Sequence, residues 1–179
     1  MLMARDEAAL LVVDLQAKLV PAVQDGDAIL QRAGILLAAA RRLDVPVVVS
    51  EQYPQGLGHT DSRLRLPAEA AVLAKTTFSC LREPGLASHL EGLRRRQIVV
   101  CGMETHVCVL QTALDLHRSG YRVFVAADAV GSRAAARRQL GLERMRSAGL
   151  AIVDSEMVVF EWLERAATDV FRELVNLLK

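Results

Sequence analysis

Residues 98–108 read Ile-Val-Val-Cys-Gly-Met-Glu-Thr-His-Val-Cys, a short apolar run that passes through a glycine into a segment with helical spacing. Similar β-branched runs cover residues 8–13, 45–49 and 123–127. Nearly continuous apolar runs of this length are typical of strands that are buried on both faces of a parallel sheet. The stretch therefore predicts one strand-to-helix unit of an α/β protein.

Segments with helical spacing separate these strands. One apolar face contains residues 29, 33, 36, 40 and 43, and another contains residues 107, 110, 114 and 117. Glycines 120 and 149 follow helical stretches and predict turns into the next strand. This alternation of strand and helix predicts a parallel sheet with right-handed crossovers and helices on both faces.

The C-terminal part of the chain predicts a sixth strand over residues 150–153 and then two amphipathic helices. Thr168 is the expected N-cap of the second helix. Its apolar stripe consists of Val170, Phe171, Leu174 and Leu178. Apolar stripes here and on the helix after Cys108 exceed what one sheet face obviously needs, so we expect a homo-oligomer.

Length and charge limit the classes of function. The 179 residues, 52% of them hydrophobic, suit one domain spanning residues 1–179. Lysine and arginine number 22 against 21 acidic residues, which leaves no electrostatic footprint for nucleic acid or an anionic membrane. No apolar run approaches the roughly 20 residues that span a bilayer. We therefore expect a small-molecule substrate and neither nucleic acid nor membrane as a partner.

Three cysteines, at positions 80, 101 and 108, are too few for a disulfide framework, and no Cys-x-x-Cys pair suggests a zinc or redox site. Cys80 and Cys101 lie in or beside apolar runs and are expected in the core. The first residues, Met-Leu-Met-Ala-Arg-Asp-Glu, lack the features of a secretion signal. These features predict a cytoplasmic protein with reduced thiols.

Polar residues follow several predicted strands, at the sheet edge where parallel sheets bind ligands. Cys108 lies in the expected first turn of a helix, with Thr105 as its N-cap. Free amides and the helix dipole at that place favour a thiolate, and the same amides can stabilise an oxyanion. From position alone, a buried structural cysteine is the alternative to a catalytic one.

Lys75 ends a run that is expected to form a buried strand, where an ammonium needs a carboxylate partner. Asp14, at the end of the first strand, is the candidate. Together they could position a proton acceptor beside the thiol, or they could form a structural ion pair at the end of the sheet.

Further candidate substrate contacts are less specific. They are Gln16, Tyr53, Phe78 and His106. Core packing is an equal interpretation for the two aromatic residues, and a surface position is an equal one for the histidine. Residues 51–70 form the one long irregular stretch, and connections of this length inside a compact domain are usually functional or mobile.

Residues 11–16, 73–79 and 102–109 resemble, in the correct order, the three signature blocks of the isochorismatase-like cysteine hydrolases. Residues 50–60 and 127–133 resemble the branch called isochorismatase domain-containing proteins. The resemblance implies a three-layer α-β-α fold, Rossmann-like, with a six-stranded parallel sheet. It also implies a catalytic triad of Asp14, Lys75 and Cys108, and a cis peptide bond between Met103 and Glu104. The backbone amides of Glu104 and Cys108 would then form an oxyanion hole.

The resemblance also implies a reaction. Asp14 would take the proton of Cys108, whose thiolate attacks a carbonyl to give a thioester and release an amine. Nicotinamidases of this superfamily carry a metal-binding aspartate and histidines after the second strand. Here only His59 lies near Glu51 and Asp61, so we expect no metal and no cofactor.

Cys108 favours amide chemistry, because isochorismatases proper lack the nucleophilic cysteine. The alternatives are a vinyl ether hydrolase, in which Asp14 acts as a general acid, and a non-catalytic binding or scaffold protein with the same fold.

Overall fold

The computed structural model describes residues 1–178. Its centre is a six-stranded, all-parallel sheet in the order β3-β2-β1-β4-β5-β6. The strands are β1 (Ala8–Val13), β2 (Val47–Gln52), β3 (Ala71–Lys75), β4 (Gln97–Met103), β5 (Arg122–Gly131) and β6 (Ala151–Val153). The predicted number of strands and their parallel arrangement are confirmed.

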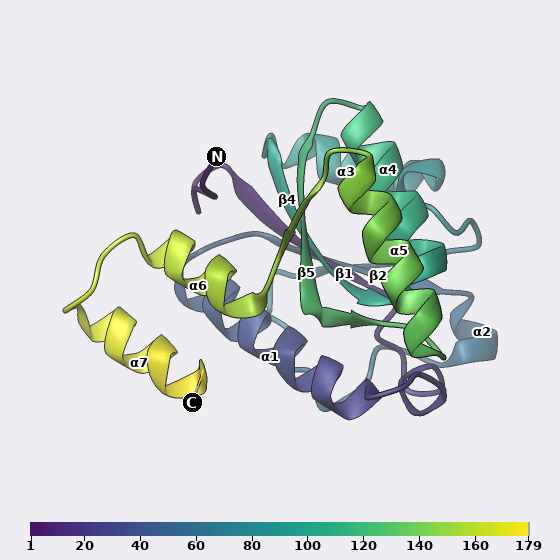
Figure 1. Cartoon of the computed structure of the whole chain (residues 1–179), viewed down its shortest axis with the longest axis horizontal. Helices are drawn as coiled ribbons and strands as arrows, with labels where there is room; N and C mark the ends of the chain where they lie inside the picture. The colour runs from purple at the N-terminus through teal and green to yellow at the C-terminus, as the bar shows by residue number, and fades with distance from the viewer. Residues whose placement is uncertain (179) are drawn as a thin grey trace.

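Helices cover both faces of this sheet (Figure 1). On one face lie α1 (Gly26–Arg42), α6 (Ser155–Leu163) and α7 (Asp169–Leu178). On the other lie α3 (Pro84–Gly92), α4 (Leu110–Arg118) and α5 (Ala135–Ser147). A short helix, α2 (Pro54–Leu57), lies within the connection after β2. The three-layer α-β-α architecture therefore agrees with the expectation.

Strand β1 shows why the apolar runs form a central sheet. All six of its residues are buried. Leu10 and Val12 pack with α1 on one face, while Ala9 and Leu11 pack with α3 and α4 on the other. Alternating side chains of a strand point to opposite faces, so a strand between two helical layers needs apolar residues throughout.

The helix after β4 differs from its predicted form. Residues Thr105–Val109 make a π-helical turn before α4 begins at Leu110. A wider turn rotates the residues that follow it. The buried face therefore contains Ala113 and Leu116, while His117 is exposed and Leu114 is half-buried. Of the apolar face predicted from residues 107, 110, 114 and 117, Leu110 is buried, and Val107 and Leu114 pack against the same core, so the prediction was wrong only at His117.

The strand that ends at Lys75 also differs. β3 is an edge strand whose residues alternate in exposure, and only Lys75 itself is fully buried. The expectation of a strand buried on both faces was wrong, because β3 pairs only with β2. Lys75 is nevertheless 2% exposed, since its side chain extends inward past β2.

The C-terminal helices follow the sequence prediction closely. Thr168 caps α7, with its Oγ1 accepting a hydrogen bond from the Phe171 amide at 3.0 Å. Leu174 is buried, and the rest of the stripe packs against the same core as α1. This stripe is thus used within the chain and gives no support to self-association, so the homo-oligomer stays a prediction. Within residues 1–178, no helix has the length and apolar character to cross a bilayer.

Gly102 allows β1 and β4 to approach each other at the carboxyl edge of the sheet. Its φ is +127°, and a Cβ there would lie 1.9 Å from the Val13 carbonyl oxygen. We predict that Gly102→Ala lowers the free energy of unfolding by at least about 2 kcal/mol, as measured by urea denaturation.

Gly34 is the matched control for this substitution, because a Cβ on that helical residue meets nothing within 4 Å. Gly34→Ala should stabilise the protein by about 0.5–1 kcal/mol. Equal stabilities of Gly102→Ala and the unmodified protein would contradict the prediction.

Candidate active site

The predicted site lies where the sheet topology changes direction. The chain runs outward from β1 to β2 and β3 and then crosses to β4, which lies on the other side of β1. Ligands of open parallel sheets bind outside the carboxyl ends of the strands at such a point. Asp14 directly follows β1, and Cys108 lies in the turn after β4. Asp14 and Cys108 therefore come from neighbouring central strands.

Asp14 lies at the centre of the candidate site and interacts with the side chains of Lys75 and Ser50. Its Oδ2 lies 2.8 Å from Lys75 Nζ, and both side chains are wholly buried. Ser50, from the intervening strand β2, donates a hydrogen bond to Oδ1 at 2.7 Å. Cys108 is 7% exposed, and its thiol is among the groups that act on the pKa of this carboxylate. The structure thus brings the three predicted residues together.

Burial dominates the protonation of this group. It raises the pKa of Asp14, although Lys75 and Ser50 act in the opposite direction. Burial and then the charge of Asp14 raise the pKa of Cys108 to about 12. For Lys75, burial alone would lower the pKa, but Asp14 and Cys108 outweigh it and the pKa is raised.

This raised pKa favours the thiol over the thiolate. The expectation that the helix start would favour a thiolate was wrong for this state, because burial and the carboxylate outweigh the helix dipole. A thiol of this kind needs a base in direct contact to become a nucleophile, and Asp14 is such a group.

The turn between β4 and Cys108 has unusual backbone geometry. Met103 and Glu104 are joined by a cis peptide bond, at the place that the resemblance implied. The carbonyl of Glu104 accepts hydrogen bonds from the amides of Val107 and Val109. Glu104 therefore occupies the N-cap position, and the Thr105 hydroxyl is without a partner in the described part of the chain. The predicted cap was one residue too late, while Cys108 does lie in the first turn.

Residues 8–157 match the family model described as the isochorismatase domain. The chain belongs to the isochorismatase family. It is 39% identical over 166 residues to isochorismatase domain-containing protein 1 of Danio rerio, which covers 93% of this chain and 59% of that protein. The chain thus spans about three fifths of the length of that relative.

Two further relatives align with this isochorismatase-family chain over most of its length and most of their own. Isochorismatase domain-containing protein 2A of Mus musculus is 37% identical over 175 residues, which is 97% of this chain and 84% of the mouse protein. The structure of MAR1 ribonuclease from Caenorhabditis elegans superimposes with a TM-score of 0.93 and 33% identity, covering 99% of this chain and 92% of the other. The isochorismatase-like fold is therefore established.

The side chain of Glu104 fastens this turn of the isochorismatase fold to the segment after β5. Arg133 forms a two-pronged ion pair with it, with an Nη2 to Oε1 distance of 2.6 Å. His106 Nδ1 lies 3.0 Å from Ser132 Oγ and 3.6 Å from Glu104 Oε2. Because its ring is engaged with this network and its side chain is only 18% exposed, His106 is better assigned to the support of the turn than to substrate contact.

The Glu104–Arg133 pair gives a pH-dependent stability. Burial would raise the pKa of Glu104, but the hydrogen bonds and charge of Arg133 outweigh it and lower the pKa below its usual 4.5. A carboxyl with a lowered folded-state pKa stabilises the fold above its unfolded pKa, and this contribution is lost as the pH falls through the lowered value. Glu104→Gln should therefore weaken the acid dependence of stability.

The measurement for this prediction is urea denaturation at several pH values between 6 and 3. The difference in unfolding free energy between pH 6 and pH 3 should be smaller for Glu104→Gln than for the unmodified chain. Glu69→Gln is the control, since Glu69 has no ion pair within the described residues. An unchanged pH dependence in Glu104→Gln would contradict the assignment.

Gln16 is engaged within the chain. Its side chain is completely buried, and its Oε1 accepts the Gln52 amide at 2.7 Å. Its Nε2 donates to the carbonyls of Gln52 and Gly58, at 3.0 and 2.5 Å. Every hydrogen-bonding group of this amide is therefore used within the chain. Gln16 thus holds the connection after β2, and its contact with a substrate stays a prediction.

The two aromatic candidates are exposed and not part of the core. Tyr53 is 55% and Phe78 is 53% exposed. Both flank Lys75, because the Tyr53 amide donates to the Lys75 carbonyl and the Phe78 carbonyl lies 3.3 Å from Lys75 Nζ. Their part in a substrate pocket stays a prediction.

Gln52 is a site residue that the sequence interpretation missed. Its Oε1 lies 2.6 Å from Lys75 Nζ and 4.0 Å from Cys108 Sγ. The apolar run before it suggests that β2 stops at residue 49, whereas the strand continues to Gln52 and pairs it with Lys75. The only signal in the sequence was its position next to Glu51, among polar residues that follow a strand.

The acidic residues near His59 are engaged within the loop. Glu51 accepts hydrogen bonds from the amide and hydroxyl of Thr60 at 2.7 and 2.8 Å, and lies 3.0 Å from His59 Nδ1. Asp61 is held separately by Arg63. Within residues 1–178, no three side chains of metal-ligand type gather at one place. These residues order the connection between β2 and β3.

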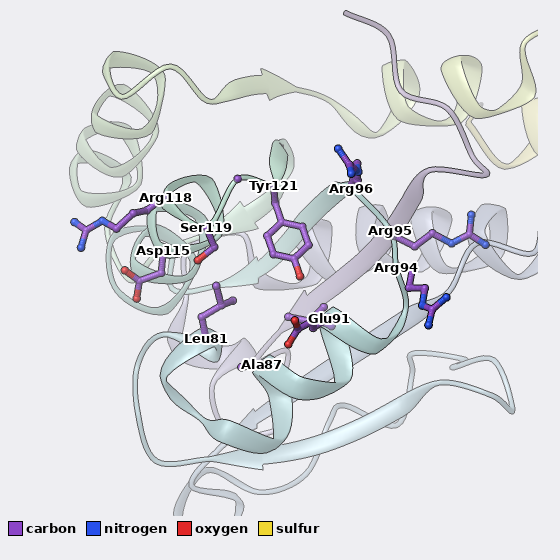
Figure 2. A pocket seen from close by; sticks show the side chains of 12 residues that line it. Leu81, Ala87, Glu91, Arg94, Arg95, Arg96, Asp115, Arg118, Ser119 and Tyr121 are labelled. Carbon is purple, nitrogen blue, oxygen red and sulfur yellow. The ribbon is translucent and has the colours of Figure 1, made fainter.

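A cavity of about 880 Å³ lies away from Cys108. Residues before the amino ends of β4 and β5 line it, so it is at the opposite edge of the sheet. Figure 2 shows Arg118 on one side of it and Arg94 and Arg95 on the other, while Arg96 points in a third direction. These arginines lie at or just after the C-terminal ends of α3 and α4, where the helix dipole favours positively charged side chains. This cavity does not identify the reactive site.

Proposed function

We propose that the protein is a metal-independent hydrolase that cleaves an amide or a similar C–N bond of a small molecule, with Cys108 as nucleophile. The observation that carries the proposal is the gathering of three groups at one edge of the sheet: the buried Asp14 carboxylate lies 2.8 Å from the Lys75 ammonium, and the Cys108 thiol acts electrostatically on both. A base that touches the nucleophile and is itself held by a third group is the arrangement of covalent hydrolases.

The first half of the proposed reaction forms a thioester. Asp14 accepts the proton of Cys108, and the sulfur attacks the substrate carbonyl carbon. The C–N bond then breaks, and the amine or ammonia leaves with the proton that Asp14 returns. The raised pKa of Asp14 makes it a stronger base than an ordinary carboxylate, which suits this exchange.

The second half consumes water. Asp14 accepts a proton from a water molecule, whose oxygen attacks the thioester carbon and expels Cys108. The sulfur recovers its proton, and the carboxylic acid product departs. Lys75 stays protonated throughout, because its pKa is raised, and it balances the negative charge beside the sulfur.

Negative charge develops on the carbonyl oxygen of the substrate when the thioester forms and again when it is hydrolysed, and hydrogen-bond donors must stabilise it. We assign these to the backbone amides of Glu104 and Cys108. Glu104 follows the cis peptide bond, and its side chain is fastened by Arg133. An oxyanion hole depends on donors that are held in place before the reaction, and a fastened turn supplies such rigidity.

The experiment is a substrate panel followed by covalent trapping. The panel contains small carboxamides, a vinyl ether and a single-stranded RNA, the last because a structural relative carries the name MAR1 ribonuclease. Acid quenching during turnover of an amide should leave one substrate-derived acyl group on Cys108, detected by peptide mass mapping. Turnover of the vinyl ether or RNA that survives alkylation of Cys108 would reject the proposal.

A further inference from the structure

The side chain of Gln52 has a defined orientation. An ammonium group can only donate, so the atom that faces Lys75 Nζ at 2.6 Å must be the amide oxygen. The amide nitrogen then points to the Thr76 carbonyl, to which it donates at 2.9 Å. Both partners thus require the same orientation of the amide, with its oxygen toward Lys75 and Cys108.

The backbone of Gln52 is held as firmly as its side chain. Its amide and carbonyl both bond to the buried side chain of Gln16, at 2.7 and 3.0 Å. Gln52 also pairs with Lys75 in the register of β2 and β3. A fixed donor and acceptor pattern of this kind makes the position of the Gln52 oxygen reproducible.

The Lys75 ammonium has two short contacts, to Asp14 Oδ2 at 2.8 Å and to Gln52 Oε1 at 2.6 Å. Its contacts with the carbonyls of Thr77 and Phe78 are longer, at 3.3 Å. Gln52 is therefore the one neutral side chain with a short bond to this ammonium among residues 1–178. It is also half-buried, in contrast to Asp14 and Lys75, so it lies on the side of the site nearest solvent.

We propose that Gln52 is a positioning residue, whose neutral oxygen holds Lys75 against Asp14 without placing a second negative charge beside the Cys108 sulfur. The inference rests on the proposed function of Cys108. A carboxylate at this position would accept the same bond from Lys75, but it would lie about 4.0 Å from the sulfur and oppose formation of the thiolate.

Alkylation of Cys108 tests this without knowledge of the substrate. The second-order rate with iodoacetamide at pH 8 is measured by intact mass and peptide mapping for Gln52→Glu and Gln52→Met. Gln52→Glu should be at least about tenfold slower than the unmodified protein, which corresponds to a rise of one unit in the thiol pKa. Gln52→Met has a similar shape and no charge, so its rate should stay within about threefold.

Gln55→Glu is the matched control, because it adds the same charge to an exposed residue of α2 only three positions away. It should react at the unmodified rate. With an identified substrate, Gln52→Met should lower kcat by about tenfold and change KM less, since Lys75 loses a short bond but the pocket keeps its size. Thermal unfolding confirms that each variant is folded.

Two results would overturn the role of Gln52: a Gln52→Glu rate within about twofold of the unmodified protein, or equal slowing in Gln52→Met. A different result would reject the proposed function of Cys108 itself. In that case the unmodified Cys108 reacts no faster than Cys80 and Cys101, and turnover survives in Cys108→Ala. A reactive Cys108 with no effect of Gln52→Glu rejects the positioning role alone.

Discussion

Replacing Cys108 with alanine should lower kcat on an amide substrate by at least about 10⁴-fold, because loss of the nucleophile leaves only binding and the oxyanion donors. The change removes a single sulfur atom and leaves the Asp14–Lys75 ion pair in place, so we expect the chain to fold. Turnover is measured by ammonia release, and folding by thermal unfolding.

Cys101→Ala is the matched control for this experiment. Cys101 precedes Cys108 by seven residues, is wholly buried, and has a pKa that burial raises to about 12. Its side chain packs on the opposite face of the sheet, in the core that includes α1. It should retain turnover, since no member of the triad contacts it. Similar activity in the Cys101 and Cys108 variants would show that the thiol is not the nucleophile.

The second large effect concerns the buried ion pair. Lys75→Met should lower the free energy of unfolding by about 3–5 kcal/mol at pH 8, because the carboxylate of Asp14 is left wholly buried without its cation. A carboxyl whose folded-state pKa is raised binds its proton more readily when folded. The loss should therefore shrink as the pH falls through that raised pKa toward the unfolded value of 3.8.

A double-mutant cycle separates stability from catalysis. Adding Asp14→Asn to Lys75→Met removes the unpaired charge and should recover most of the stability, while turnover stays at least about 10²-fold below normal because no base remains. Urea denaturation and ammonia release give the two readouts.

The surface pair of Arg82 and Asp115 is the reference for this cycle. Its Nε to Oδ2 distance is 2.9 Å, but the Arg82 side chain is 64% exposed. Arg82→Met should cost at most about 1 kcal/mol, since exposed pairs contribute little. If Lys75→Met cost no more than Arg82→Met, the pair would not be the buried, charge-balanced unit described above.

The fold was predictable because its signal is local and repeated. Strands such as Ala8–Val13 are apolar on both faces, and helix α1 carries one continuous apolar face. Thr168 likewise caps α7 as expected, because an N-cap depends only on residues a few positions away. The details that failed depended on the fold. Residues Thr105–Val109 form a π-helical turn in place of a regular helix start, and the pairing of strands decided that β3 is an edge.

The same division holds for the candidate site. Polar residues at the ends of apolar strands made Asp14, Lys75 and Cys108 candidates, because such residues gather at one edge of a parallel sheet, and the family resemblance joined them into a triad. Only the tertiary structure decided their electrostatics. Burial raises the pKa of Cys108, whereas its position at a helix start predicted a lowered one.

The tertiary structure also decided which neighbours serve the site. Gln16 and Gln52 are both polar residues at strand ends, and nothing in the sequence distinguishes them. Strand register places Gln52 beside Lys75, and the Gln16 amide bonds to the Gln52 backbone and to the Gly58 carbonyl. Residue types and their order along the chain thus determine the candidate chemistry. Burial and strand register arise only when distant segments pack together. They determine the pKa values of Asp14 and Cys108 and the side chains that hold Lys75 in place.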